Sequence, residues 1–345
     1  MVAYIIRRLL MLPIVLLGVS ILVFSLLSVL SPYERLSFYV DENLLSHIDS
    51  DEDWDVLIER FGLDQPMPLQ YARWLKNVLS GNLGYSTVAR MPLSRAIAKY
   101  FPASVELALL SVIPVLLVGI RMGFFSAERV GTVADHTMRG VAIIGWSLPS
   151  FVAGLLLLLL FYGLLPWFPP GRVSVGFIPL TRSADFIRYT NMMSVDALLN
   201  GEWRLFIDSL RHLVLPIVTM SYLSWALLMR VARSALLNEL HQDYVTTARA
   251  KGLRERDVRR HARRNSLISV TTISGMMVAG LLTGVVITET IFNLPGLGRL
   301  MAEGSLALDA VTVVGTAMLN GAILVVANLV VDILYTFLDP RIRLG

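Results

Sequence analysis

The sequence has no cysteine among its 345 residues. Without thiols the chain cannot form a disulfide framework, nor a thiolate site for a metal or for redox chemistry. It also lacks the phosphate-binding loop G-x-x-x-x-G-K-[ST], since no glycine is followed by lysine. That loop holds the phosphates of a bound nucleotide, so we expect no ATPase site on this chain.

Signs of other catalytic or metal chemistry are equally scarce. The sequence has neither a G-x-S-x-G motif, which would present a nucleophilic serine, nor an H-E-x-x-H pair, which would bind zinc. Its five histidines are scattered: His47, His136, His212, His241 and His261. We therefore expect no catalytic residue, no metal site and no cofactor on this chain, and interpret it as a protein that is not an enzyme.

Charged residues are few, at 16% of the chain, whereas hydrophobic residues make up 55%. This apolar content exceeds that of an ordinary water-soluble core and predicts an integral membrane protein. A helix needs about 20 residues to cross the hydrocarbon core of a bilayer, and runs of that kind recur six times. They are Leu9–Leu30, Phe101–Ile120, Gly140–Phe168, Leu213–Met229, Leu267–Thr288 and Ala310–Val331. The runs are continuously apolar and do not alternate as barrel strands would, so the predicted fold is all-α with six transmembrane helices.

The first run follows Arg7 and Arg8, as the core of a signal peptide would. It is too long for a signal peptide, and no A-x-A cleavage pattern follows it, so we interpret it as an uncleaved first span. The predicted division of the chain is a tip and first span at 1–31, an external loop at 32–100, a five-helix core at 101–338 and a tail at 339–345.

The distribution of charge predicts the orientation. Residues 230–264 contain ten Lys or Arg and four Asp or Glu, a net charge of +6, whereas residues 32–100 contain seven and ten, a net charge of −3. Because cytoplasmic loops carry an excess of Lys and Arg, we expect a helical hairpin at 234–266 and both chain ends in the cytoplasm. The large loop at 32–100 is then external, and its apolar spacing predicts two short amphipathic helices on either side of a turn at 64–68.

The hairpin contains the stretch DYVTTARAKGL, in which Gly252 follows a set of residues at helical spacing. We expect Gly252 to end a short helix in the left-handed conformation, and a second helix to follow over Arg254–Asn265. Small residues are expected where the two helices meet: Thr246, Thr247, Ala248 and Ala250. A basic loop against anionic lipid headgroups is the alternative, but small side chains favour a helix that enters a groove on another protein.

Several segments resemble the inner-membrane permease subunits of ABC importers, and specifically the B-type subunit of the dipeptide, oligopeptide and nickel class. The similar segments are YIIRRLLMLPIVLLGVSILVF, FGLDQPMPLQYARWL, GNLGYS, FPASVELALL, DYVTTARAKGL, ETIFNLPGLGRL and NLVVDILYTFLDPRIR. They occur in the family's order over nearly the whole chain. The family motif E-A-A-x-x-x-G has Thr246 in place of its glutamate, and Ser269 stands where a proline is usual.

The resemblance implies half of a substrate pathway, paired with a different, C-type permease subunit in the cytoplasmic (inner) membrane of a bacterium or archaeon. The implied partners are two ATPase subunits that bind ATP and Mg, an extracytoplasmic substrate-binding protein and membrane lipid, with no nucleic acid. Di- or oligopeptides are the expected cargo, with a nickel chelate or an oligosaccharide as alternatives. The residues expected to couple the chain to the ATPases are Asp243, Tyr244, Thr247, Ala248, Arg249, Lys251 and Gly252.

Three residues are candidates for the substrate pathway: Glu289, Trp146 and Ser147. Glu289 lies near the predicted external end of the fifth span, where it could face the pathway or tie helices together. A secondary transporter and an intramembrane hydrolase are the alternatives from other classes. A secondary transporter would bury ion-coupling acids within its spans, and the middle parts of these spans contain no Asp, Glu, Lys or Arg. A hydrolase would need a nucleophile and a base inside the spans, and the sequence indicates no such pair. The pairs Gly119/Gly123 and Gly280/Gly284 have the spacing that permits close helix contact.

Overall fold

The computed structural model describes residues 2–36, 38–40, 51–283 and 286–338. Within these ranges the chain is helical apart from turns, loops and one two-stranded ladder, in which β1 (Tyr85–Ser86) pairs antiparallel with β2 (Met91–Pro92). The predicted all-α class is confirmed. The predicted tail at 339–345 lies outside the described residues.

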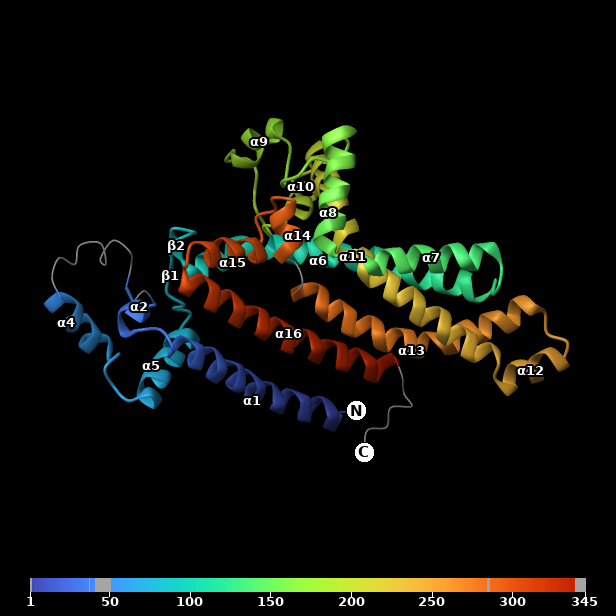
Figure 1. Cartoon of the computed structure of the whole chain (residues 1–345), viewed down its shortest axis with the longest axis horizontal. Helices are drawn as coiled ribbons and strands as arrows, with labels where there is room; N and C mark the ends of the chain where they lie inside the picture. The colour runs from blue at the N-terminus through green and yellow to red at the C-terminus, as the bar shows by residue number, and fades with distance from the viewer. Residues whose placement is uncertain (1, 37, 41–50, 284–285, 339–345) are drawn as a thin grey trace.

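Long helices form the body of the molecule (Figure 1). α6 (Leu93–Ala127) lies along α11 (Trp203–Leu240), which also packs on α13 (Glu255–Thr283), while α16 (Ala310–Leu338) lies between α13 and α1 (Val2–Leu27). The start of α1 and the ends of α6 and α16 point toward the same end of the molecule, where α12 (Asp243–Ala250) is found (Figure 1).

Glycine brings α6 and α11 together, as predicted for Gly119 and Gly123. A Cβ added at Gly123 would come within 2.6 Å of the Ala232 Cβ and of the Met229 carbonyl oxygen, so the two backbones are in direct contact there. The other predicted pair does not behave in this way. Gly280 has open space where its Cβ would be, and Gly284 lies outside the described residues.

By length and composition, three described helices could cross a membrane: Leu9–Leu27, Leu93–Ala127 and Ala310–Val331. Two further bent pairs would each serve as one span, which gives up to five among the residues searched. The fifth predicted span, 267–288, follows α13 into residues 284–285, which the structure does not describe. The count of six spans therefore stays a prediction.

The third predicted span, Gly140–Phe168, is not one straight helix but is broken near its middle. α7 (Val133–Ser147) ends before Leu148, and α8 (Ser150–Leu158) with the π-helical turn η1 (Leu159–Leu164) continues at an angle of 102°. Pro149 causes the break, because proline has no N–H and disfavours helical geometry in the residue before it. The Tyr222 hydroxyl of α11 donates to the carbonyl of Leu148 at this point.

The predicted loop at 32–100 contains the two expected amphipathic helices, α4 (Asp51–Phe61) and α5 (Met67–Leu79), together with a short α2 (Pro32–Leu36). α5 places Tyr71 and Trp74 against Phe24 of α1. Arg35 is buried and donates to Gln70 across 2.6 Å. The loop is thus packed onto the first helix.

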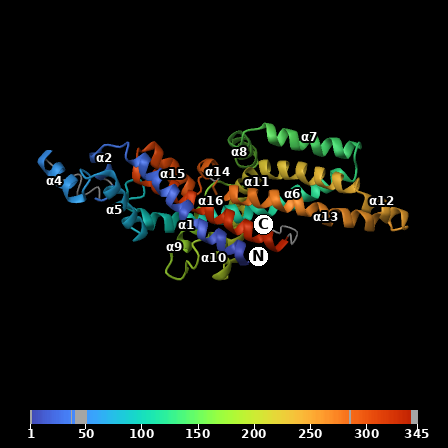
Figure 2. The same cartoon turned by 90° about the horizontal axis from the view of Figure 1, so that it is seen from below.

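The remaining elements are short and lie in two places. η2 (Val175–Phe177), α9 (Ile178–Arg182) and α10 (Met193–Leu199) project with α8 from one side of the long helices (Figure 1). α14 (Val286–Ile291) and α15 (Leu297–Leu306) lie between α13 and α16 in sequence, and α15 packs on both α16 and α6. Seen from below, α4 and α12 occupy opposite ends of an elongated molecule (Figure 2).

Candidate functional site

The charged hairpin is built from α12 and the ends of the two long helices that flank it. Gly252 has φ +77°, which is the left-handed conformation predicted for it. The Gly252 amide donates to the Arg249 carbonyl at 2.9 Å, and the Leu253 amide donates to the Ala248 carbonyl at 3.2 Å. These two bonds form a Schellman motif, which satisfies the last carbonyls of a helix. α12 therefore has a defined end, and the chain turns into α13 at Glu255.

An apolar contact fixes α12 on its neighbours. Val245, Val258 and Ala262 are fully or almost fully buried in the core that runs between the long helices, and Ala248 packs against it half-buried. The small residues Thr246, Thr247 and Ala250 are exposed, so the expectation that they lie where the helices meet was wrong. A helix of only eight residues has one narrow buried face, and the larger valine occupies it.

A groove of about 460 Å³ runs beside this contact. Its lining residues come from α12, from the turn and from the start of α13: Tyr244, Val245, Thr247, Ala248, Lys251, Leu253, Val258 and His261. Four of the predicted coupling residues, Tyr244, Thr247, Ala248 and Lys251, are thus brought to one surface. The other three, Asp243, Arg249 and Gly252, are exposed on the same hairpin.

Ion pairs and hydrogen bonds hold the outside of the hairpin. Arg249 and Glu255 are 3.1 Å apart across the turn, and the hydrogen bond from Arg249 holds the pKa of Glu255 below its usual value. The Tyr244 hydroxyl donates to Glu239 at 2.7 Å. Burial, followed by this bond to a carboxylate, raises the pKa of Tyr244. The hairpin surface is therefore charged but internally paired around the turn.

Glu289, a candidate for the substrate pathway, is 1% exposed. Its carboxylate accepts a hydrogen bond of 2.5 Å from the Ser104 hydroxyl of α6 and one of 3.0 Å from the Arg299 amide in the first turn of α15. Ser104 in turn accepts a 2.8 Å bond from the Leu297 amide. In this structure Glu289 ties α14 to α6 and to the start of α15.

Trp146 and Ser147 lie at the end of α7, directly before the break at Pro149. Trp146 is half exposed and lies 5.3 Å from the Arg230 guanidinium. The Ser147 hydroxyl donates to the Ile143 carbonyl of its own helix at 2.8 Å. Among the contacts of the described residues, none joins Glu289 to these two, so the structure does not bring the three candidates together.

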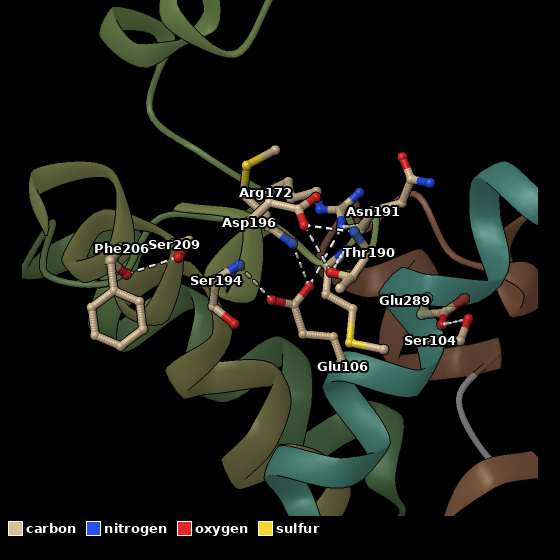
Figure 3. Close-up of polar contacts among 12 residues, drawn as sticks. Ser104, Glu106, Arg172, Thr190, Asn191, Ser194, Asp196, Phe206, Ser209 and Glu289 are labelled. Atoms are coloured by element: carbon tan, nitrogen blue, oxygen red, sulfur yellow. Dashed lines mark hydrogen bonds and ion pairs between the residues drawn. The ribbon is translucent and has the colours of Figure 1, made fainter. Parts of the chain in front are cut away.

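A second buried carboxylate, Glu106 of α6, holds the projecting segment in place (Figure 3). Glu106 accepts bonds from the amides of Met193 at 3.1 Å and Ser194 at 2.7 Å, both in the first turn of α10. Arg172 lies 3.4 Å away and also donates to the Asn191 carbonyl. The pKa of Arg172 is lowered from its usual value, because the effect of burial exceeds the opposing effect of the nearby Glu106 charge.

Sequence reasoning missed the residues that anchor the hairpin to the rest of the chain. Asp135 forms a buried ion pair with Arg233, 98 positions along the chain, and Glu128 pairs with Arg263, 135 positions along. The spacing of Thr132 and Asp135 is a helix-start signal, and the Thr132 hydroxyl does accept from the Asp135 amide. No spacing in the sequence points to the distant arginines. Among the described residues, no group of three or more His, Cys, Asp or Glu could hold a metal ion.

Comparison with known proteins identifies relatives along the whole chain. The family described as binding-protein-dependent transport system inner membrane component matches residues 119–344, and the N-terminal family of such membrane components matches residues 1–108. The oligopeptide transport system permease protein AppB of Bacillus subtilis (strain 168) is 35% identical over 345 residues, which cover 99% of this chain and 100% of the relative.

Two further relatives are similar over the same extent. The di/tripeptide transport system permease protein DppB of Pseudomonas aeruginosa (strain UCBPP-PA14) is 36% identical, and the dipeptide transport system permease protein DppB of Escherichia coli (strain K12) is 35% identical. Each comparison covers 99% of this chain and 99% of the relative. The chain therefore belongs to the family of inner-membrane components of binding-protein-dependent transport systems.

Proposed function

We propose that this chain is the membrane permease subunit of an ATP-driven importer whose cargo is a di- or oligopeptide. The observation that carries the proposal is the similarity along 99% of the chain to permeases named for oligopeptide, di/tripeptide and dipeptide transport. These names favour a peptide over a nickel chelate or an oligosaccharide. The long apolar helices and the charged hairpin support the same function.

The proposed location is the cytoplasmic membrane of a bacterium or archaeon, with both chain ends and the hairpin on the cytoplasmic side. The net charge of +6 over residues 230–264 supports this orientation. The arrangement of the helices supports it as well, because α1 starts, and α6 and α16 end, toward the end of the molecule that contains α12 (Figure 1). α4, α5 and the β-ladder then lie on the external side.

The proposed partners are a C-type permease, which supplies the other half of the pathway, two ATPase subunits, which bind ATP and Mg, and an external substrate-binding protein. The hairpin would seat in a surface groove of one ATPase subunit. When the ATPases close on ATP, the hairpin shifts with them and tilts α11 and α13. Transport is then an equilibrium between outward-facing and inward-facing states that ATP binding biases.

A pair of substitutions on α12 tests this contact. Ala248→Trp places a large side chain in the groove of this chain that α12 and the start of α13 line. This variant is expected to abolish transport while the protein still inserts into the membrane. Ala250→Trp is the matched control, because Ala250 is exposed on the same helix and does not line the groove. Peptide uptake and ATP hydrolysis stimulated by loaded binding protein would be measured in proteoliposomes that contain the whole complex.

The possible results distinguish a hairpin that contacts an ATPase subunit from a basic loop that contacts lipid. If Ala250→Trp blocks transport and Ala248→Trp does not, the opposite face of α12 makes the ATPase contact. If both variants transport normally, and exchange of Arg259 and Arg260 for glutamine abolishes uptake, the hairpin is a lipid-facing basic loop and the proposed coupling role is wrong.

The composition of the complex is a separate test. Purified complex should contain one copy of this chain and one of a different permease, and the isolated chain should not hydrolyse ATP. A transport-competent complex with two copies of this chain and no second permease would contradict the proposed pairing.

A further inference from the structure

The turn between α6 and α7 lies against both arms of the hairpin. We define the α6–α7 corner as residues 126–135, and the hairpin arms as the end of α11 and the start of α13. In both views the corner lies beside these arms (Figures 1 and 2). Each arm is joined to the corner by its own charged contact, through a different acid.

The contact with the α11 arm is buried. Asp135 is 1% exposed, and its two carboxylate oxygens accept from the Arg233 guanidinium at 2.9 and 3.0 Å. The Ser126 hydroxyl, which is fully buried, also donates to Asp135, as does the Gly131 amide at 3.2 Å. A buried ion pair is costly unless its remaining hydrogen-bonding capacity is satisfied, and here α6, the turn and α11 all contribute partners.

The contact with the α13 arm is partly exposed. Glu128 follows the last residue of α6, and its carboxylate accepts from the Arg263 Nε at 2.6 Å, with Arg259 4.0 Å away on the other oxygen. An apolar contact lies next to this pair, because Phe124 and Ala127 of α6 share one core with Val258 and Ala262 of α13. Charge and packing therefore join the same two helices.

α6 extends from the corner to the β-ladder. It has 35 residues, which corresponds to a length of about 50 Å at 1.5 Å per residue. Along this helix Ser104 contacts Glu289 and the start of α15, and Glu106 contacts the start of α10. If α6 moves with the hairpin, the displacement reaches both α10 and α15.

We propose that Glu128 and Asp135 are positioning residues of the hairpin, which hold its two arms on the end of α6 so that α6 moves with the hairpin as one unit. The inference rests on the proposed function, in which the hairpin contacts an ATPase subunit. It adds a named element, the α6–α7 corner, that carries the displacement into the part of the chain facing away from the ATPase.

A reversible cross-link tests the proposal. Because this chain has no cysteine of its own, the reagent reacts on this subunit only with the introduced thiols. The double variant Glu128→Cys, Arg263→Cys lacks the ion pair. In the assembled complex with free thiols, peptide uptake and binding-protein-stimulated ATP hydrolysis are expected to fall by about fivefold, the scale of a partly exposed ion pair.

A short bifunctional thiol reagent should then restore both activities, because the covalent link replaces the lost contact. Each single cysteine variant, treated with the same reagent, is the control and should show no recovery.

Two results would overturn the proposal. If the cross-link blocks uptake and its removal restores it, α13 and α6 move relative to one another during transport. If the uncross-linked double variant transports like the wild type, the contact does not position the hairpin. Ala248→Trp and Ala250→Trp in the same assay separate this inference from the proposed function: normal uptake by both variants would contradict the ATPase contact of α12, whatever the cross-link does.

Discussion

The two ends of this molecule satisfy their acidic side chains in different ways. At the hairpin end the acids are paired with arginine side chains, as in Arg249 with Glu255 and Arg263 with Glu128. Away from the hairpin, buried carboxylates accept from backbone amides at the starts of helices. Glu106 accepts from the first turn of α10, and Glu289 from the first turn of α15.

Asp309, before α16, is a third buried carboxylate of this kind. It accepts from the amides of Thr87 and Val88 beside the β-ladder, at 2.9 and 3.2 Å, and from the amide and hydroxyl of Thr312 at 2.9 and 2.7 Å. It thereby joins the loop at 32–100 to the start of α16. The pattern is repeated at three separate helix starts.

The difference has a mechanical consequence. A backbone amide moves only with its whole segment, so a carboxylate that accepts from it fixes one helix on another. An arginine side chain is long and flexible, and when exposed its ion pairs contribute little individually. We infer that the carboxylate-bound region is a fixed framework. At the hairpin, the pair that can exchange when a partner binds is Arg249–Glu255, because both of its side chains are about half exposed.

Loss of Glu106 should have the largest effect on this framework. Glu106→Ala leaves two buried amides and the Arg172 guanidinium without their acceptor, and removal of one partner of a buried ion pair costs about 3–5 kcal/mol. We expect a lower midpoint of thermal unfolding in detergent, and faster proteolytic cleavage between residues 172 and 196. Asp196→Ala is a useful control, because Asp196 accepts from Thr190 within the same segment and not from α6.

Glu106→Gln sharpens this prediction. The amide keeps one carbonyl acceptor for the start of α10 but loses the charge opposite Arg172. An intermediate loss is expected, between the wild type and Glu106→Ala. Equal stability of all three proteins would show that α10 is held by its apolar contacts alone.

Asp309→Ala should destabilise less, because no cation is left unpaired. Several hydrogen bonds to one buried carboxylate are lost, and a buried donor without an acceptor costs about 1–3 kcal/mol. The loop near the β-ladder should then be cut faster by protease, whereas the hairpin at 243–255 should be cut at the wild-type rate. Uniformly faster cleavage at both ends would argue against a local framework.

Gly252→Val tests the hairpin end. Gly252 is in the left-handed conformation, which costs a residue with a Cβ about 1–2 kcal/mol, and a Cβ there would meet no other atom within 4 Å. The effect is therefore conformational, and we expect normal membrane insertion with loss of transport as α13 is misdirected. Gly252→Asn is the matched control, since asparagine tolerates this conformation. Loss of transport in both variants would point to a need for glycine itself at the partner contact.

The sequence predicted most of what depends on local pattern. Apolar runs predicted the long helices, and the residues around Gly252 predicted the hairpin turn, because both signals are contained within a few helical turns. Pro149 lies within the third predicted apolar run, but the angle of 102° at this point depends on packing against α11 and could not be predicted from the local pattern. The exposed threonines of α12 were misplaced for a similar reason: the buried face is set by tertiary contact with Val258 and Ala262.

The contacts that define the site are long-range, and for that reason the sequence could not reveal them. Asp135 and Arg233 are far apart in the chain, and each is an ordinary charged residue near the end of an apolar run. Glu289 was singled out because an acid beside a span is costly, and the structure gives it partners on α6 and α15. The sequence left open whether Glu289 faces the pathway or ties helices together, and it could not identify the partners.

Glu255→Gln should have the smallest effect. Glu255 and Arg249 are both about half exposed, and a pair of this kind is screened by solvent and by salt. Hydrogen bonding to Arg249 lowers the pKa of Glu255 in the folded protein from its ordinary value of 4.5. The pair therefore stabilises the hairpin fully at a pH above 4.5, and this stabilisation is lost as the pH falls through the lowered pKa. Wild type and variant should therefore differ slightly in thermal midpoint at neutral pH and converge under more acidic conditions. A large difference at neutral pH, or one that grows on acidification, would mean that Glu255 is part of the fixed framework and that the two ends of the molecule are less distinct than their contacts indicate.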